Sequence, residues 1–175
     1  MTSDVSETRV MWGDSAAEPD WEAVYAEQLP RVYNYLRYRM GNEALAEDLT
    51  SRTFEKAWRD RHRYRRNLAA YSTWLLRIAR NVATDHQRTS HDLVALEEAA
   101  ETPADGSPEE EAVLTSNFAR LSALIAVLPE RDRELLALKY GAGATNRAIA
   151  DVTGLSESNV GTILHRTVQL LRTRW

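Results

Sequence analysis

The sequence predicts an all-α protein with two small helical domains joined by a flexible acidic linker. Apolar residues recur at helical spacing in two stretches, one on each side of a segment rich in acids. That segment holds eight acidic residues between Asp92 and Glu111, together with Pro103, Gly106 and Pro108. No stretch alternates apolar and polar residues as a half-buried strand does. We expect a disordered N-terminal extension at 1–19, a helical domain at 20–88, the linker at 89–111 and a second helical domain at 112–175.

The N-terminal domain is predicted to contain three helices, at about residues 21–40, 43–59 and 68–87. Pro30 is expected to kink or divide the first helix, because proline has no amide hydrogen to donate. The inner face of the second helix is expected to consist of Leu45, Leu49, Phe54, Ala57 and Trp58. Residues 59–67, RDRHRYRRN, lack helical apolar spacing and are predicted to form a basic loop.

The C-terminal domain is predicted to contain helices at about 114–127, 130–140, 146–153 and 157–172, the last two forming a helix-turn-helix. Ala150 is small enough for the two helices to cross steeply, and Gly154 tolerates the positive φ of the turn. Ser156 is expected to cap the next helix. Three apolar side chains are expected to close this motif, with Leu155 in the corner and Val160 and Ile163 packed on Ile149. The pattern favours a DNA reader over a purely structural helical hairpin.

The second helix of this motif has a polar outer face with little positive charge. The residues expected to contact duplex DNA there are Ser156, Glu157, Ser158, Asn159, Thr162 and Arg166. Small polar side chains can hydrogen-bond to base edges. They contribute little attraction to phosphates, which normally dominates affinity. We therefore expect this helix to bind DNA weakly on its own.

Charge is strongly segregated along the chain, although the net charge is only −4. Residues 52–88 hold ten basic and three acidic side chains, whereas residues 89–128 hold one basic and eight acidic. The field of exposed charges persists only about 8–10 Å at physiological salt. A polyanion therefore responds to the local basic block rather than to the sum. Arginine supplies nine of the ten cations in that block, which favours forked contacts to phosphates and bases.

The third predicted helix carries one apolar and one polar, cationic stripe. The apolar stripe consists of Trp74, Leu75, Ile78, Ala79 and Val82, and the polar stripe of Arg77, Arg80, Asn81, Thr84 and Arg88. The preceding loop interleaves cations with an aromatic ring in Arg61, His62, Arg63, Tyr64, Arg65 and Arg66. Basic charge combined with aromatic stacking surfaces is how proteins bind unpaired bases.

Several classes of protein are disfavoured by the composition. The absence of cysteine excludes disulfides and thiolate metal sites. The first twenty residues are polar and acidic, unlike a signal peptide, and no apolar run is long enough to cross a bilayer, so we expect a cytoplasmic protein.

The histidines do not indicate a catalytic or metal site. His62, His86 and His91 lack the spacing of a metal or acid–base site, and Asp85 is expected to pair with Arg88 or Arg77. We expect no catalytic activity, metal or cofactor.

Three segments resemble a known family. AEDLTSRTFEKAW at 46–58 and WLLRIARNVATDHQR at 74–88 resemble the most characteristic stretches of bacterial sigma factors of the extracytoplasmic-function (ECF) group. LPERDRELLALKY at 128–140, followed by the helix-turn-helix, is similar to the C-terminal domain of that family. The resemblance covers about residues 21–88 and 112–173. The sequence departs from the usual pattern at four positions. The family often has glutamine at the position of Ser51, glutamate at that of Ala148, and basic residues at those of Gly161 and Ile163.

This resemblance implies a dissociable promoter-specificity subunit of RNA polymerase. The helix at 46–58 would bind the β′ clamp of core polymerase, with Asp48, Arg52, Phe54 and Glu55 as candidate contacts. The basic loop and third helix would open the −10 element and bind its single strand, with candidate contacts Arg61, His62, Arg63, Tyr64, Arg65, Asn67, Arg77, Arg80, Asn81 and Arg88. The helix-turn-helix would read the −35 duplex while its domain binds the β flap. Because polymerase tethers both domains, weak individual binding suffices.

Two further interpretations concern partners. A stand-alone helix-turn-helix regulator would use its N-terminal domain for dimerisation or sensing, and would bind a palindromic duplex without polymerase. The asymmetric polar recognition face and the basic aromatic loop argue against that alternative. Sigma factors of this group are commonly held inactive by an anti-sigma factor wedged between the domains, and the sequence permits such a partner without identifying one.

Overall fold

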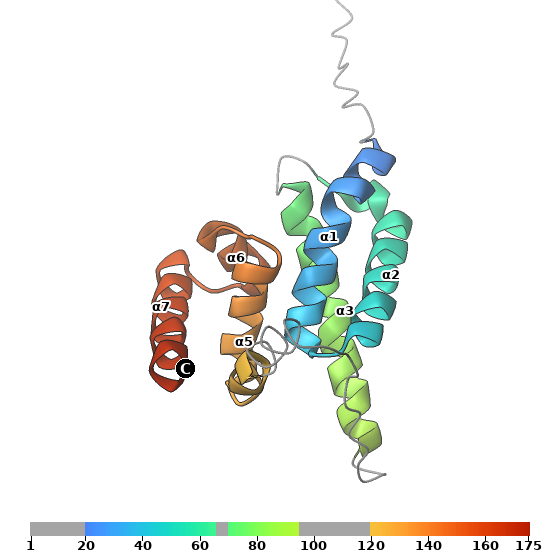
Figure 1. Ribbon diagram of the computed structural model, residues 1–175. Helices are drawn as coiled ribbons and strands as arrows, with labels where there is room; N and C mark the ends of the chain where they lie inside the picture. Colours follow the sequence, from blue (N-terminus) through green and yellow to red (C-terminus); the bar gives the residue numbers. More distant parts are fainter. Residues whose placement is uncertain (1–19, 66–69, 95–119) are drawn as a thin grey trace, which may run out of the picture.

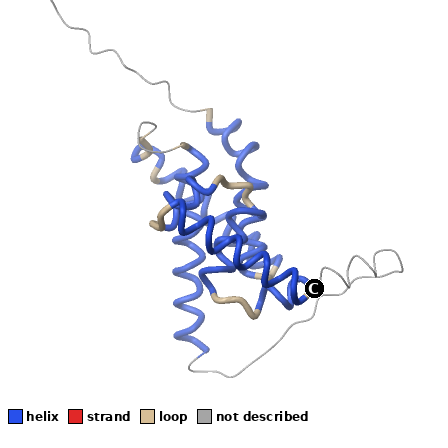
Figure 2. The backbone as a smooth tube through the Cα atoms, turned by 90° about the vertical axis from the view of Figure 1, so that its left-hand side faces the viewer, coloured by secondary structure: helices blue, strands red, loops and turns tan. Residues whose placement is uncertain are grey.

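The computed structural model describes residues 20–65, 70–94 and 120–175, of which 91–94 are described as backbone only. Every regular element in these ranges is helical, which confirms the all-α prediction (Figures 1 and 2). The predicted extension at 1–19 lies outside the described residues, and so does most of the predicted linker. None of the described helices combines the length and the apolar character that crossing a bilayer requires.

Helix α1 spans Trp21–Met40, as predicted. The carboxylate of Asp20 caps it by accepting hydrogen bonds from the amides of Glu22 and Ala23, at 3.1 and 3.3 Å. Pro30 was expected to kink or divide this segment, and the division was wrong, because the helix continues through the proline. Pro30 is exposed, so water can bind the carbonyl that its missing amide leaves free, and buried side chains beyond it, Val32, Tyr35 and Leu36, anchor the second half.

Helix α2 spans Glu43–Arg59, again as predicted. The predicted inner face was wrong at Trp58, because this side chain is 52 % exposed rather than buried. Thr50 and Thr53 are buried instead. Their hydroxyls donate to the carbonyls of Ala46 and Leu49, at 2.6 and 2.7 Å, so these polar groups are satisfied within the helix.

Helix α3 spans Tyr71–Val94 and is displaced towards the C-terminus relative to the predicted 68–87. It therefore enters the segment from residue 89 that was expected to be linker. The linker was placed by its acidic composition, but the first helix-breaking residue after α3 begins is Pro103. The apolar stripe was predicted correctly, since Leu75, Ile78 and Ala79 are buried and Trp74 and Val82 pack against them.

In the described C-terminal residues, 120–126 are helical, within the helix predicted at 114–127, and α5 follows at Glu130–Leu136. The α-helix predicted for 130–140 changes at Ala137 into a π-helix, η2, at Ala137–Gly141. The amide of Ala142 donates to the carbonyl of Ala137 at 3.0 Å, which closes this wider turn. Helix α6 spans Asn146–Thr153, as predicted, and α7 spans Glu157–Arg174, slightly beyond its predicted end.

The two domains are packed against each other. Helix α1 contacts η2 and α3 contacts α6, whereas α7 packs on α5 and α6 at the far side of the C-terminal domain (Figure 1). Buried apolar residues of both domains, from Val32 to Leu164, form one cluster. The sequence predicted the two domains but not their contact.

Gly161 offers a test of local helix stability. It lies inside α7, and a methyl group built on it would meet only Nδ2 of Asn146, at 3.5 Å. Because alanine favours a helix interior over glycine, we expect Gly161→Ala to raise the free energy of unfolding by about 0.5–1 kcal/mol in urea denaturation.

The matched control is Gly154→Ala, at a position with φ of 79° and open space around it. That substitution should lower the free energy of unfolding by about 1–2 kcal/mol through backbone strain alone. Destabilisation by Gly161→Ala would contradict this account of α7.

Candidate nucleic-acid interface

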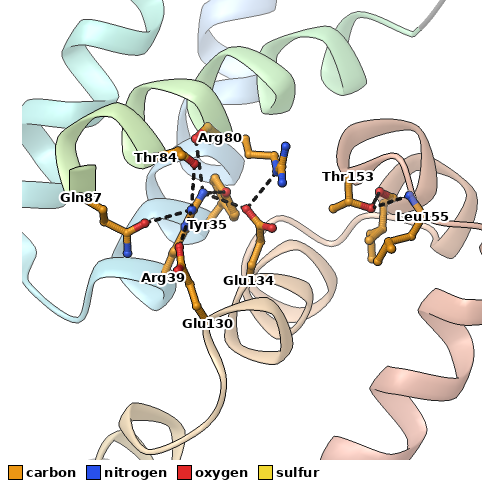
Figure 3. A network of polar contacts seen from close by, with 10 residues as sticks. Tyr35, Arg39, Arg80, Thr84, Gln87, Glu130, Glu134, Thr153 and Leu155 are labelled. Atoms are coloured by element: carbon orange, nitrogen blue, oxygen red, sulfur yellow. Dashed lines mark hydrogen bonds and ion pairs between the residues drawn. The ribbon is translucent and has the colours of Figure 1, made fainter. Parts of the chain in front are cut away.

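The helix-turn-helix has the geometry predicted from its sequence. Gly154 ends α6 with φ of 79°, and its amide donates to the carbonyl of Ala150 at 2.8 Å. The hydroxyl of Ser156 caps α7 by accepting from the amide of Asn159 at 3.2 Å. At the corner, the amide of Leu155 donates to the hydroxyl of Thr153 at 3.4 Å (Figure 3). This local bonding fixes the direction in which α7 leaves the turn.

The residues predicted for −35 contacts lie at the N-cap of α7 and along this helix. All of them are exposed, namely Ser156, Glu157, Ser158, Asn159, Thr162 and Arg166. Val160 and Ile163 are buried with Ile149, as predicted. Ile163 is only 3 % exposed, so its departure from the usual family pattern lies in the core and not on the outer face.

One residue that orients this face was missed from the sequence. The buried carboxylate of Asp132 in α5 accepts from the hydroxyl of Thr167 at 3.0 Å and from the guanidinium of Arg166 at 3.4 Å. The Arg166 side chain is otherwise largely exposed. Asp132 lies in the segment LPERDRELL, where an acidic residue is expected at the start of a helix. Nothing in that pattern indicates that its carboxylate binds residues more than thirty positions away.

In the N-terminal domain, the predicted basic loop contains a short 3₁₀ turn at Arg61–Arg63. His62, Arg63 and Arg65 are exposed there, and Asn67 lies outside the described residues. The guanidinium of Arg61 lies over the ring of Trp58, 4.2 Å from its centroid. The guanidinium therefore covers part of the ring of Trp58, which is otherwise at the surface.

Next to this turn is an aromatic cluster that joins the ends of α1, α2 and α3. Tyr64 lies 4.4 Å from Tyr71 and 5.4 Å from Trp74 between ring centroids, and Trp21 contacts both Tyr71 and Trp58. Burial raises the pKa of Tyr71 above its ordinary value. Tyr64 is half-buried, and the rings of Tyr71 and Trp74 already cover part of its surface.

The polar stripe of α3 is divided between solvent and the C-terminal domain. Asn81 is exposed, and exposed Arg88 pairs with Asp85 at 3.3 Å, one of the two pairings predicted for Asp85. Arg77 donates twice to the backbone carbonyl of Asp151 in α6, at 2.7 and 3.0 Å. Arg80 bonds to Glu134 of α5, through Nε at 3.1 Å. Two of the predicted −10 contacts therefore bind the other domain in this arrangement.

Arg39 lies at the centre of the contact between the domains, in a group of polar residues that we name the interdomain cluster (Figure 3): Tyr35, Arg39, Arg80, Thr84, Gln87, Glu130 and Glu134. The side chain of Arg39 is 3 % exposed and lies 2.9 Å from the carboxylate of Glu134, which is 7 % exposed. It also donates to the hydroxyl of Tyr35 at 2.8 Å. Burial lowers the pKa of Arg39, but Tyr35 and Glu134 outweigh that effect and raise it, so the guanidinium stays charged.

The charged residues predicted to bind polymerase, Asp48, Arg52 and Glu55, form an exposed row on α2. Asp48 and Arg52 pair at 2.9 Å, and Glu55 pairs with Arg59 at 3.6 Å. Phe54 is half-buried and packs edge-on against Tyr25, with 4.7 Å between ring centroids. The charged members of the row are thus available at the surface, whereas Phe54 belongs largely to the fold.

His62, His86 and His165 are the histidines whose side chains the structure describes. Across the described residues, no three histidine or acidic side chains are close enough to hold one. The ring of His86 is 3.2 Å from the hydroxyl of Ser90.

Comparison with known proteins places both domains in one family. Residues 24–92 match the family described as Sigma-70 region 2, and residues 118–171 match Sigma-70, region 4. The chain is 33 % identical to the RNA polymerase sigma factor CarQ of Myxococcus xanthus over 159 residues, which cover 89 % of each protein. It is 32 % identical to the ECF sigma factor BldN of Streptomyces coelicolor, but spans only 57 % of that protein.

Solved structures share the fold at lower sequence identity. The sigma factor RpoE, solved in complex with the anti-sigma factor NepR from Bartonella quintana, matches with a TM-score of 0.71 and 19 % identity, over 88 % of this chain and 95 % of RpoE. CnrH, solved with the cytosolic domain of CnrY, matches with a TM-score of 0.60 and 20 % identity, over 92 % of this chain and 88 % of CnrH. With both regions present in order, and with CarQ related over nearly its whole length, the chain is a member of the extracytoplasmic-function group of bacterial RNA polymerase sigma factors.

Proposed function

We propose that this chain binds core RNA polymerase in the bacterial cytoplasm and directs initiation at promoters with its own −10 and −35 elements. In this proposal α2 binds the β′ clamp, the loop after α2 and the polar stripe of α3 bind the opened −10 strand, and α7 reads the −35 duplex. The observation that carries the proposal is the order of two matched regions in one chain, a basic, aromatic unit followed by a helix-turn-helix.

The direct test is run-off transcription with core polymerase on a pool of genomic fragments. Specific transcripts that depend on this chain are expected, and their mapped starts would define its promoters. Failure to bind core polymerase at micromolar concentration would overturn the proposal. A stand-alone regulator would instead bind a palindromic duplex without polymerase, and the match of residues 24–92 to sigma region 2 argues against it.

Anti-sigma proteins are a further class of candidate partner. RpoE was solved with the anti-sigma factor NepR, and CnrH with the cytosolic domain of CnrY. The corresponding partner of this chain would be found by co-purification from its native cells under conditions in which the chain is inactive.

Asn81 tests the role of α3. Its exposed amide can hydrogen-bond to an unpaired base, and its side chain is not part of the buried core. We expect Asn81→Ala to slow promoter opening about ten-fold, because one base contact is worth about 1–3 kcal/mol. Opening is measured by permanganate reactivity of unpaired thymines in the holoenzyme complex. Thr89→Ala, an exposed change further along α3, is the control; equal rates for both variants would contradict this assignment.

Asn159 tests the role of α7. It lies exposed in the first turn, where recognition helices present side chains to base edges. Asn159→Ala should reduce discrimination between the best −35 sequence and its single-base variants by about five-fold or more, through loss of about 1–3 kcal/mol at one position. Competition binding of holoenzyme to the two duplexes measures this ratio. Gln169→Ala, exposed at the far end of α7, should leave the ratio unchanged.

Arg52 tests the polymerase-binding row. Its ion pair with Asp48 is exposed on both sides, so its contribution to stability is below about 1 kcal/mol. Arg52→Glu should therefore leave the thermal midpoint nearly unchanged while weakening core-polymerase binding about ten-fold or more, because it reverses charge on the contact surface. Fluorescence titration against core polymerase measures the affinity. Glu27→Lys, an exposed reversal on α1, is the control, and an equal loss there would refute the assigned face.

A further inference from the structure

We propose that Asp132 is a positioning residue for −35 recognition, whose buried carboxylate directs Arg166 towards one base pair of the duplex. The inference rests on the function proposed above and names the residue that governs one contact of the recognition helix. Both residues belong to the C-terminal domain, Asp132 to α5 and Arg166 to α7. The arrangement therefore does not depend on how that domain sits on the N-terminal one.

Arg166 is the last member of a row of exposed polar side chains on α7. Asn159, Thr162 and Arg166 follow one another at steps of three and four positions, so they lie on the same side of the helix. Arg166 is about 10 Å further along α7 than Asn159, at about 1.5 Å per residue. Successive bases of a strand are only about 3.4 Å apart. Arg166 is therefore expected to contact a different base pair from Asn159.

An exposed arginine has many rotamers, and ordering it on DNA costs affinity. The Arg166 side chain is 64 % exposed. Within the described residues it is restrained by Asp132, since its Nη2 donates to Oδ2 at 3.4 Å. This distance is long for a hydrogen bond, so attraction between the two charges supplies much of the contact. The Nε and Nη1 of Arg166 remain available to donate to a base or a phosphate.

The carboxylate of Asp132 is itself held in place. Its side chain is 7 % exposed and lies in the first turn of α5, where the helix dipole stabilises a negative charge. The hydroxyl of Thr167 lies 3.0 Å from Oδ2 of Asp132 and 2.8 Å from the carbonyl oxygen of Ile163, and it shares its single hydrogen between them. Thr167 is 2 % exposed, so this contact ties Asp132 to the inner face of α7. A fixed anion thus lies beside a mobile cation and sets its direction.

Arg166 is also the charge that this carboxylate requires. Oδ1 of Asp132 is buried and has no hydrogen-bond partner among the residues that the structure describes. Nε of the neighbouring Arg131 is 3.9 Å away from it. A buried carboxylate with so few donors is tolerated only beside an opposite charge. Asp132 and Arg166 are therefore paired before DNA binds, which lowers the cost of ordering Arg166 on the duplex.

The first experiment measures the mobility of Arg166 in the free chain. Nuclear magnetic relaxation gives the order parameter of its Nε–H bond, with Arg172, exposed near the end of the same helix, as the reference. We expect Arg166 to be the more restricted of the two, and Asp132→Asn to make it as mobile as Arg172. Equal mobility in the wild-type chain would overturn the proposal, and this result requires neither a variant nor DNA.

The second experiment is competition binding of holoenzyme to promoter duplexes that carry single-base-pair changes in the −35 element. Arg166→Ala identifies the base pair that Arg166 contacts. Asp132→Asn should reduce discrimination at that base pair about three- to ten-fold, the cost of ordering one long side chain. It should leave discrimination at the base pair of Asn159 unchanged, and it should have no further effect in the Arg166→Ala background.

Asp151→Asn is the matched control, because it removes another negative charge from the same domain at an exposed position in α6. It should change discrimination at neither base pair. Circular dichroism establishes that each variant is folded.

Three outcomes of the binding experiment would overturn the proposal. Equal losses at both base pairs, or an undiminished effect of Asp132→Asn in the absence of Arg166, would mean that Asp132 only stabilises the domain. Tighter binding with unchanged discrimination would mean that Asp132 competes with DNA for Arg166. A holoenzyme that transcribes no promoter would instead overturn the proposed function, and the mobility of Arg166 would still test its pairing with Asp132.

Discussion

A charged guanidinium enclosed at the meeting point of two domains sets the main constraint on this molecule. Arg39 is nearly inaccessible to solvent, and a buried charge is tolerated only when it is paired and hydrogen-bonded. The N-terminal domain supplies most of its hydrogen bonds, but the closest carboxylate belongs to Glu134 of the C-terminal domain. The same carboxylate binds Arg80, which projects from the polar stripe of α3. The relative position of the domains therefore also sets how far Arg80 is accessible.

The sequence predicted the helices better than their contacts, for identifiable reasons. Helices α1, α2 and α6 have their predicted bounds. Capping residues mark where they begin, and glycines mark the ends of α1 and α6. Helix α3 was ended too early because acidic composition suggested a linker before any helix-breaking residue occurs. The interdomain contact could not be predicted, since charged residues such as Arg39 and Glu134 are expected at the surface and their pairing spans 95 positions of the chain.

The candidate site was foreseen to a similar extent. The turn at Gly154, the cap at Ser156 and the exposed polar face of α7 follow from local rules, so the pattern sufficed. The basic loop was predicted as a surface feature, but Tyr64 packs among other rings, which a list of charges and aromatics does not reveal. Asp132 was missed because its partners, Arg166 and Thr167, lie on a different helix.

The π-helical turn at Ala137–Gly141 makes the placement of the recognition helix sensitive to chain length at one point. A π turn accommodates one more residue than an α turn, and each residue of an α-helix advances the backbone by about 100°. Loss of one residue here would let the turn revert to α geometry. Helices α6 and α7 would then follow α5 in a different direction. Gly141 would no longer face α1, and the helix-turn-helix would be rotated as a unit with its own fold intact. A one-residue deletion at this turn would therefore re-aim α7 without altering any of its side chains.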